Sequence, residues 1–117
     1  MLKTLGRVRE IGLAGVSVLL AACASADGPV LISTDGMRFV QTEVRVQTGQ
    51  PVTLHVVNRD GYAHAFDIDE FDVHVPLPAG ATVEASLPPA EPGRYRFYCG
   101  SPGHAAAGMT GVLVVEP

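Results

Sequence analysis

YCGSPGHAAAGM is the sequence of residues 98–109, near the C-terminus of the 117-residue chain. It contains a cysteine, a histidine and a methionine, each five positions after the last: Cys99, His104 and Met109. Thiolate and imidazole are ligands that copper favours, and a weak thioether ligand is typical of one class of copper site. The glycines of this stretch permit a tight backbone path, so the three side chains can converge on one ion. The stretch therefore predicts a copper site that is held largely by one loop.

The residues on both sides of this loop are typical of β-strands. Residues 94–99 place Tyr95 and Phe97 on one face, and residues 111–116 are rich in valine. Residues 42–47 alternate polar and apolar side chains with a period of two, as a half-buried strand does. Further strands are expected at 30–32, 52–57, 63–68 and 82–87, with a brief edge strand at 73–75 that stops at Pro76. Short strands separated by turn residues, without a helical pattern after residue 22, predict an all-β Greek-key sandwich.

A copper centre of this kind needs a second imidazole from elsewhere in the chain. His64, in the short strand expected at residues 63–68, is the leading candidate. His55 and His74 are the alternatives. His55 lies inside an alternating strand and His74 in a Val-His-Val strand, so a place on a sheet face is the simpler role for each.

Cys99 has two alternative roles. A free cysteine is often a small core residue. In an exported protein, Cys99 could also form a disulfide with Cys23, the other cysteine of the chain. The spacing of His104 and Met109 after Cys99 favours the metal site over both alternatives.

The first 22 residues have the pattern of an export signal. Lys3, Arg7 and Arg9 precede an apolar run at residues 11–22. This run is shorter than the roughly 20 apolar residues that span a bilayer, and its length and flanks suit a secretory signal peptide. An anchor helix that is never cleaved is the alternative interpretation.

The apolar run ends in Leu20-Ala21-Ala22-Cys23, which resembles the bacterial lipobox. That resemblance implies that Cys23 is lipidated and becomes the first residue of the mature protein. We therefore divide the chain into a signal peptide at 1–22, a tether at 23–29 and one domain at 30–117. The expected location is the outer face of a bacterial membrane, on the periplasmic or cell-surface side, with the protein held there by its N-terminal lipid.

The charge of the mature chain narrows the choice of partners. After residue 22 the chain has five arginines, no lysine and 11 acidic side chains, which gives a net charge of −6. Nucleic-acid-binding proteins present basic patches, so we expect no nucleic-acid partner. A negative surface suits partners with a positive docking surface.

Four acidic residues lie close together at Asp67, Asp69, Glu70 and Asp72. They lack the spaced Asp/Asn and Gly pattern of an EF-hand calcium loop. We interpret them as a solvated loop rather than a calcium site.

Residues 58–67 together with residues 94–115 resemble the cupredoxin family of small blue copper proteins. The Cys-x4-His-x4-Met spacing is most similar to that of the rusticyanin and sulfocyanin branch. The resemblance implies a single copper ion with His64, Cys99 and His104 as trigonal ligands and Met109 as a long axial ligand.

One position departs from the family pattern. Many cupredoxins have Asn or Ser after the first histidine ligand, where the side chain helps to fasten the ligand loop near the cysteine sulfur. This chain has Ala65 there. We therefore expect a hydrogen bond around the metal to be missing, with an effect on the reduction potential or colour of the site.

Four protein ligands leave no open position on the metal, which favours one-electron transfer over catalysis. Multicopper oxidases flank this cysteine with histidines, whereas Tyr98 and Gly100 flank Cys99 here. We expect an electron carrier that is not an enzyme, a monomer that exchanges electrons with other redox proteins through the edge of His104. The alternatives are a copper-trafficking or copper-buffering lipoprotein and a metal-free adhesion domain.

Overall fold

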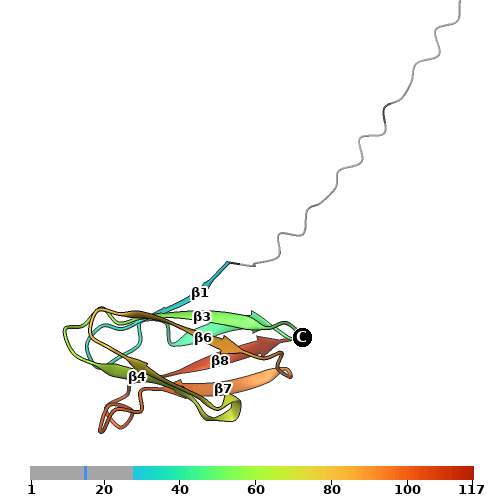
Figure 1. Ribbon diagram of the computed structural model, residues 1–117. Helices are drawn as coiled ribbons and strands as arrows, with labels where there is room; N and C mark the ends of the chain where they lie inside the picture. The colour runs from blue at the N-terminus through green and yellow to red at the C-terminus, as the bar shows by residue number, and fades with distance from the viewer. Residues whose placement is uncertain (1–14, 16–27) are drawn as a thin grey trace, which may run out of the picture.

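The computed structural model describes residue 15 and residues 28–117. The expected signal peptide, the lipidation site Cys23 and most of the tether lie outside these residues. Eight strands and one short 3-10 helix make up the domain (Figure 1): β1 (Val30–Ser33), β2 (Glu43–Gln47), β3 (Val52–Val57), β4 (His64–Ile68), η1 (Asp69–Phe71), β5 (Val73–Leu77), β6 (Thr82–Leu87), β7 (Gly93–Tyr98) and β8 (Thr110–Glu116).

The strands form two sheets. One sheet has the order β1-β3-β6 and the other has the order β2-β8-β7-β4-β5. Strands β1 and β3 pair in parallel, as do β2 and β8, whereas the other pairs are antiparallel. The chain crosses repeatedly from one sheet to the other, so strands that are distant in sequence become neighbours. The predicted all-β Greek-key sandwich is confirmed.

The core lies between the sheets because alternate residues of the strands face inward. In β2, Val44 and Val46 are buried while their neighbours are exposed, and β8 buries Leu113 and Val115 in the same way. Alternation with a period of two is the pattern of a sheet with one buried face. This burial is the main force that holds the two sheets together.

Three phenylalanines occupy the centre of this core. The ring of Phe39 packs edge-to-face against Phe66 and Phe97, with ring centroids 5.9 and 5.2 Å apart. Phe66 and Phe97 come from the neighbouring strands β4 and β7, and their centroids are 5.4 Å apart. Edge-to-face aromatic pairs contribute about 0.5–1.5 kcal/mol beyond the burial of their area. The cluster therefore fixes β4, which begins at His64, against β7, which ends just before Cys99.

Strand β5 differs from the prediction, which ended it at Pro76. The strand continues to Leu77, whose side chain is fully buried. It is the outer strand of its sheet, so it has a partner on one side only, and the N–H that proline lacks is not needed for a second partner. The prediction of an edge strand was right, but its end was placed too early.

Two loops lie at the same end of the sandwich, opposite the C-terminus (Figure 1). One joins β3 to β4 and leads into His64, and the other joins β7 to β8 and contains Cys99, His104 and Met109. The fold therefore brings the two parts of the predicted metal site together. Within the described residues, no helix is long and apolar enough to cross a membrane.

Gly111 gives a test of the core next to this loop. A Cβ atom at Gly111 would lie 2.1 Å from Cζ of Phe97, whose ring is fully buried. We expect Gly111→Ala to lower the free energy of unfolding by about 1–3 kcal/mol, the usual cost of overpacking a core. Urea denaturation of the metal-free protein measures this change. Gly61→Ala is the control, because a Cβ at Gly61 meets no atom within 4 Å; an equal loss in both variants would contradict the prediction.

Candidate metal centre

Three side chains meet at the end of the sandwich: His64, Cys99 and His104. The Nδ1 atoms of the two histidines are 3.2 Å apart. The sulfur of Cys99 lies 3.9 Å from Nδ1 of His64 and 3.5 Å from Nδ1 of His104. These three atoms form a small triangle, and the fold brings His64 to Cys99 although the two residues are 35 positions apart in sequence.

The size of the triangle suits a first-row transition metal. Typical bonds of about 2.1 Å to imidazole nitrogen and about 2.3 Å to thiolate sulfur place trigonal donors roughly 3.6–3.8 Å apart. The observed separations are close to these values. Imidazole nitrogens and a cysteine sulfur at such distances need a shared proton or a cation between them. The residues therefore fit copper, which favours sulfur and imidazole ligands.

The group is largely closed to solvent. Cys99 is fully buried, and the side chain of His64 has no exposed surface. His104 is half-buried and closes the outer side of the group. A buried sulfur and a buried imidazole that face one another suit the retention of a metal ion.

The β7–β8 loop is fixed by its own backbone. The N–H of Cys99 donates to the carbonyl of Met109 at 3.0 Å and closes the loop where the two strands separate. Inside the loop, the N–H of Met109 donates to the carbonyl of His104 at 3.0 Å. Gly103 and Gly108 have φ values of 80° and 102°, which side chains rarely adopt. The glycines thus permit the tight turn that returns His104 over Cys99.

Met109 is fully buried at the end of this loop. Its backbone is hydrogen-bonded to both Cys99 and His104, so Met109 is fixed as part of the same loop. Its role as the long axial ligand stays a prediction.

His64 is oriented by a carboxylate that was not predicted from the sequence. Nε2 of His64 lies 2.9 Å from Oδ2 of Asp60. An ionised carboxylate only accepts hydrogen bonds, so Nε2 carries the proton and Nδ1 has a free lone pair. Asp60 therefore selects the tautomer in which Nδ1 faces Cys99 and His104, as carboxylates behind metal-binding histidines commonly do.

Asp60 is itself held by the loop after β1. It accepts hydrogen bonds from the hydroxyl of Thr34 at 2.7 Å and from the N–H of Gly36 at 2.9 Å. Burial alone would raise the pKa of the Asp60 carboxyl, but the hydrogen bonds from Thr34, Gly36 and His64 outweigh it and the pKa lies below its ordinary value. Asp60 is therefore charged at neutral pH and can hold the His64 ring.

The backbone of Ala65 supplies a hydrogen bond at the position where the family pattern has a polar side chain. Its N–H donates to the sulfur of Cys99 at 3.3 Å. A hydrogen bond to the sulfur of Cys99 is thus present despite Ala65, although a side-chain bond from this position is excluded by the residue type.

Asp67 fixes the ligand loop by a hydrogen bond to its backbone. It is 8% exposed, and its Oδ2 accepts the N–H of Gly100, the residue after Cys99, at 2.9 Å. A Cβ atom at Gly100 would lie 2.5 Å from this oxygen, so the contact requires glycine. The interpretation of Asp67 as part of a solvated loop was therefore wrong, whereas Asp69, Glu70 and Asp72 lie in or beside η1 and outside the core.

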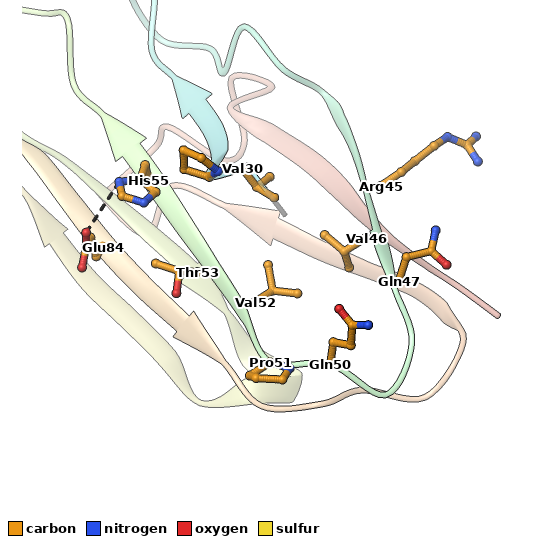
Figure 2. A pocket seen from close by; sticks show the side chains of 12 residues that line it. Val30, Arg45, Val46, Gln47, Gln50, Pro51, Val52, Thr53, His55 and Glu84 are labelled. Carbon is orange, nitrogen blue, oxygen red and sulfur yellow. Dashed lines mark ion pairs between the residues drawn. The ribbon is translucent and has the colours of Figure 1, made fainter. Parts of the chain in front are cut away.

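The two alternative histidines lie away from the metal group. Nδ1 of His74 is 2.9 Å from Oδ1 of Asp67. His55 pairs with Glu84 at 3.6 Å beside a groove of about 820 Å³. Figure 2 shows this groove between β2 and β3, with His55 and Glu84 at one end. None of the residues that line it belongs to the predicted ligand set.

Comparisons with known proteins agree with this geometry. A family model described as "Cupredoxin-like domain" matches residues 11–115 of the chain. Among curated proteins, none matches the chain.

Several solved structures have a similar fold. Auracyanin A from Chloroflexus aurantiacus, described as a "blue" copper protein, is 26% identical, with a TM-score of 0.63 over 76% of this chain and 100% of that one. Reduced auracyanin from Roseiflexus castenholzii is 22% identical, with a TM-score of 0.68 over 76% and 97% of the two chains. Rusticyanin is 23% identical, with a TM-score of 0.60 over 74% and 75%.

Asp60 gives a test of how the site is preorganised. We expect Asp60→Asn to weaken copper binding about 10- to 100-fold, the usual effect of removing a partner behind a metal-binding histidine. A competition titration against a chelator of known affinity measures this change. Glu70→Gln is the control, because it removes one charge from an exposed position. Equal affinity of Asp60→Asn and wild type would show that Asp60 does not orient His64.

Proposed function

The chain belongs to the cupredoxin-like family, and from this premise we propose that it carries single electrons on one copper ion held by His64, Cys99, His104 and Met109. The observation that carries this proposal is the convergence of two imidazole nitrogens and one cysteine sulfur within 3.9 Å of one another in a closed site. Bound copper would supply one-electron exchange between Cu(I) and Cu(II).

The protein contributes rigidity to this exchange. Asp60 holds His64, Ala65 donates to the sulfur of Cys99, and Asp67 holds the following residue, Gly100. Ligands fixed in this way move little when the charge of the metal changes, which keeps the reorganisation during electron transfer small. Cupredoxins are mainly electron carriers rather than enzymes, and the closed donor group agrees with such a role.

His104 is the ligand through which electrons would enter and leave. It is half-buried, whereas Cys99 and Met109 are fully buried and His64 is 3% exposed. The small residues at 105–107 follow it in the loop and leave space for a partner. A redox protein that docks on this end of the sandwich would bring its own cofactor closest to the imidazole edge of His104.

We propose further that the carrier acts outside the cytoplasm as a monomer that is held on a bacterial membrane by a lipid on Cys23. The lipobox-like residues before Cys23 support this proposal. Cupredoxins typically work in the periplasm or outside the cell. Mass spectrometry of the membrane fraction tests it: a diacylglyceryl-modified N-terminal peptide that begins at Cys23 is expected, and an unmodified Cys23 would contradict it.

Copper trafficking is the alternative role, and the burial of the donors argues against it. A protein that hands copper to a partner needs ligands that the partner can reach, whereas Cys99 and Met109 are fully buried here. Slow loss of Cu(I) to a competing chelator would support the carrier, and rapid transfer of Cu(I) from a colourless site would support trafficking.

A visible spectrum and a redox titration test the main proposal. The copper-loaded protein is expected to show intense absorption from the thiolate–copper bond and one reversible one-electron couple. Cys99→Ser should lose this absorption, while Ser101→Ala should keep it and serves as the control. A wild-type protein that does not retain copper would contradict the proposal, and the metal-free adhesion domain would stay an alternative.

Ala106 tests the route of the electron. It is exposed in the ligand loop, two positions after His104. We expect Ala106→Glu to slow electron exchange with the natural partner at least about tenfold, because a buried charge in the docking surface is costly, while copper content stays the same. Gln50→Glu, at the opposite end of the sandwich, introduces the same charge as a control. Equal rates for wild type and Ala106→Glu, measured by stopped-flow, would contradict a route through His104.

A further inference from the structure

One carboxylate joins the surface of the protein to the ligand loop. Oδ2 of Asp67 accepts the N–H of Gly100 at 2.9 Å, and Oδ1 of the same side chain lies 2.9 Å from Nδ1 of His74. Gly100 directly follows Cys99 in the chain. The side chain of Asp67 is 11% exposed, whereas that of His74 is 53% exposed. A proton on His74 can therefore exchange with solvent while its partner stays close to the metal group.

The surroundings of His74 are acidic. From β4, Asp67 faces it, and from the turn before β5, Asp72 lies 3.5 Å from its Nε2. Asp69 of η1 is close enough for its charge to act on His74. It also accepts a hydrogen bond from the hydroxyl of Tyr98 on β7, and Arg96 lies over the ring of Tyr98. The hydrogen bond to Asp67, with the charges of Asp67, Asp72 and Asp69, raises the pKa of His74 above its ordinary value despite partial desolvation.

We propose that Asp67 is a positioning residue for the Cys99 end of the ligand loop. His74 makes the influence of Asp67 on the copper depend on pH. The reduction potential would then be controlled by a histidine that is not a ligand. This inference rests on the proposed electron-carrier function and adds a regulation of the same site.

The direction of the effect follows from charge. Protonated His74 balances the negative charge of Asp67, and loss of that proton leaves an uncompensated carboxylate beside Gly100. Net negative charge near the metal favours Cu(II) over Cu(I). The reduction potential should therefore be highest at low pH and fall as the pH rises through the pKa of His74. Linkage requires the reverse effect too: His74 binds its proton more tightly when the copper is reduced.

The size of the effect can be estimated from the linkage. The proton on His74 and the charge that the copper gains or loses are separated by the partly buried carboxylate of Asp67, so they interact weakly. We therefore expect the acid dissociation constants of His74 in the two copper states to differ about threefold. For a one-electron couple, 59 mV corresponds to a factor of ten, so a threefold ratio corresponds to a change of about 28 mV across the titration.

The first experiment uses the metal-free protein. Amide and imidazole NMR signals are followed as a function of pH in wild type and in His74→Gln. We expect the amide of Gly100 to shift with the same midpoint as the ring of His74 in wild type, and this shift to be absent in His74→Gln. A Gly100 amide that does not follow the titration of His74 would overturn the connection through Asp67.

The second experiment uses the copper-loaded protein. The reduction potential is measured against pH in wild type, in His74→Gln and in the control His55→Gln, which removes a titratable histidine from the other sheet. His74→Gln keeps a hydrogen-bond donor for Asp67 but cannot gain a proton. In wild type and His55→Gln we expect the reduction potential to change by about 28 mV across the titration of His74. We expect this change to be absent in His74→Gln.

The outcomes separate this inference from the proposed function. A reversible couple with the same pH profile in wild type and His74→Gln would overturn the inference alone. A wild-type protein without a reversible copper couple would overturn the electron-carrier function, and the control of the potential with it.

Discussion

Two imidazole nitrogens and the sulfur of Cys99 lie within 3.9 Å of one another, and the rest of the structure holds them there. Each donor is fixed by neighbouring groups that do not themselves bind the metal. Asp60 holds His64, the N–H of Ala65 reaches the sulfur of Cys99, and the turn at His104 is closed by backbone bonds. The folding of the sandwich supplies the free energy for this arrangement, since the phenylalanine cluster fixes the strands that carry the donors. A metal ion can therefore bind to donors that the fold has already brought together.

The carboxylates around the centre have different roles. Asp60 lies behind a ligand and selects its tautomer, whereas Asp67 lies behind the backbone next to a ligand and fixes the path of the loop. Both are negative, so both favour the more positive state of a bound metal. Only Asp67 has a titratable partner at the surface, His74, among the residues that the structure describes. The side of the centre at Asp67 can therefore respond to the pH of the solvent, whereas the side at Asp60 has no such partner in the described part of the chain, although both sides carry a carboxylate.

The ligand types could be predicted from sequence because cysteine, histidine and methionine rarely follow one another at such close, equal intervals unless they bind a metal. The strands could be predicted because alternation in residues 42–47 reports one buried face directly. Asp60 and Asp67 could not be found in this way. A carboxylate in a polar stretch looks the same whether it faces solvent or a backbone N–H, and the difference depends on which loop the fold brings near. The only signal for Asp60 was its position four residues before His64, and for Asp67 it was the glycine at position 100.

Strand β4 contributes three of these contacts within four residues: the ligand His64, the N–H of Ala65 and the carboxylate of Asp67. Side chains along a strand alternate between faces, so a shift of one residue in its alignment with β5 and β7 would remove all three contacts together. The site can therefore form in only one register of β4. A bound metal would therefore stabilise this alignment of β4 over a slipped one, because only this alignment could bind it.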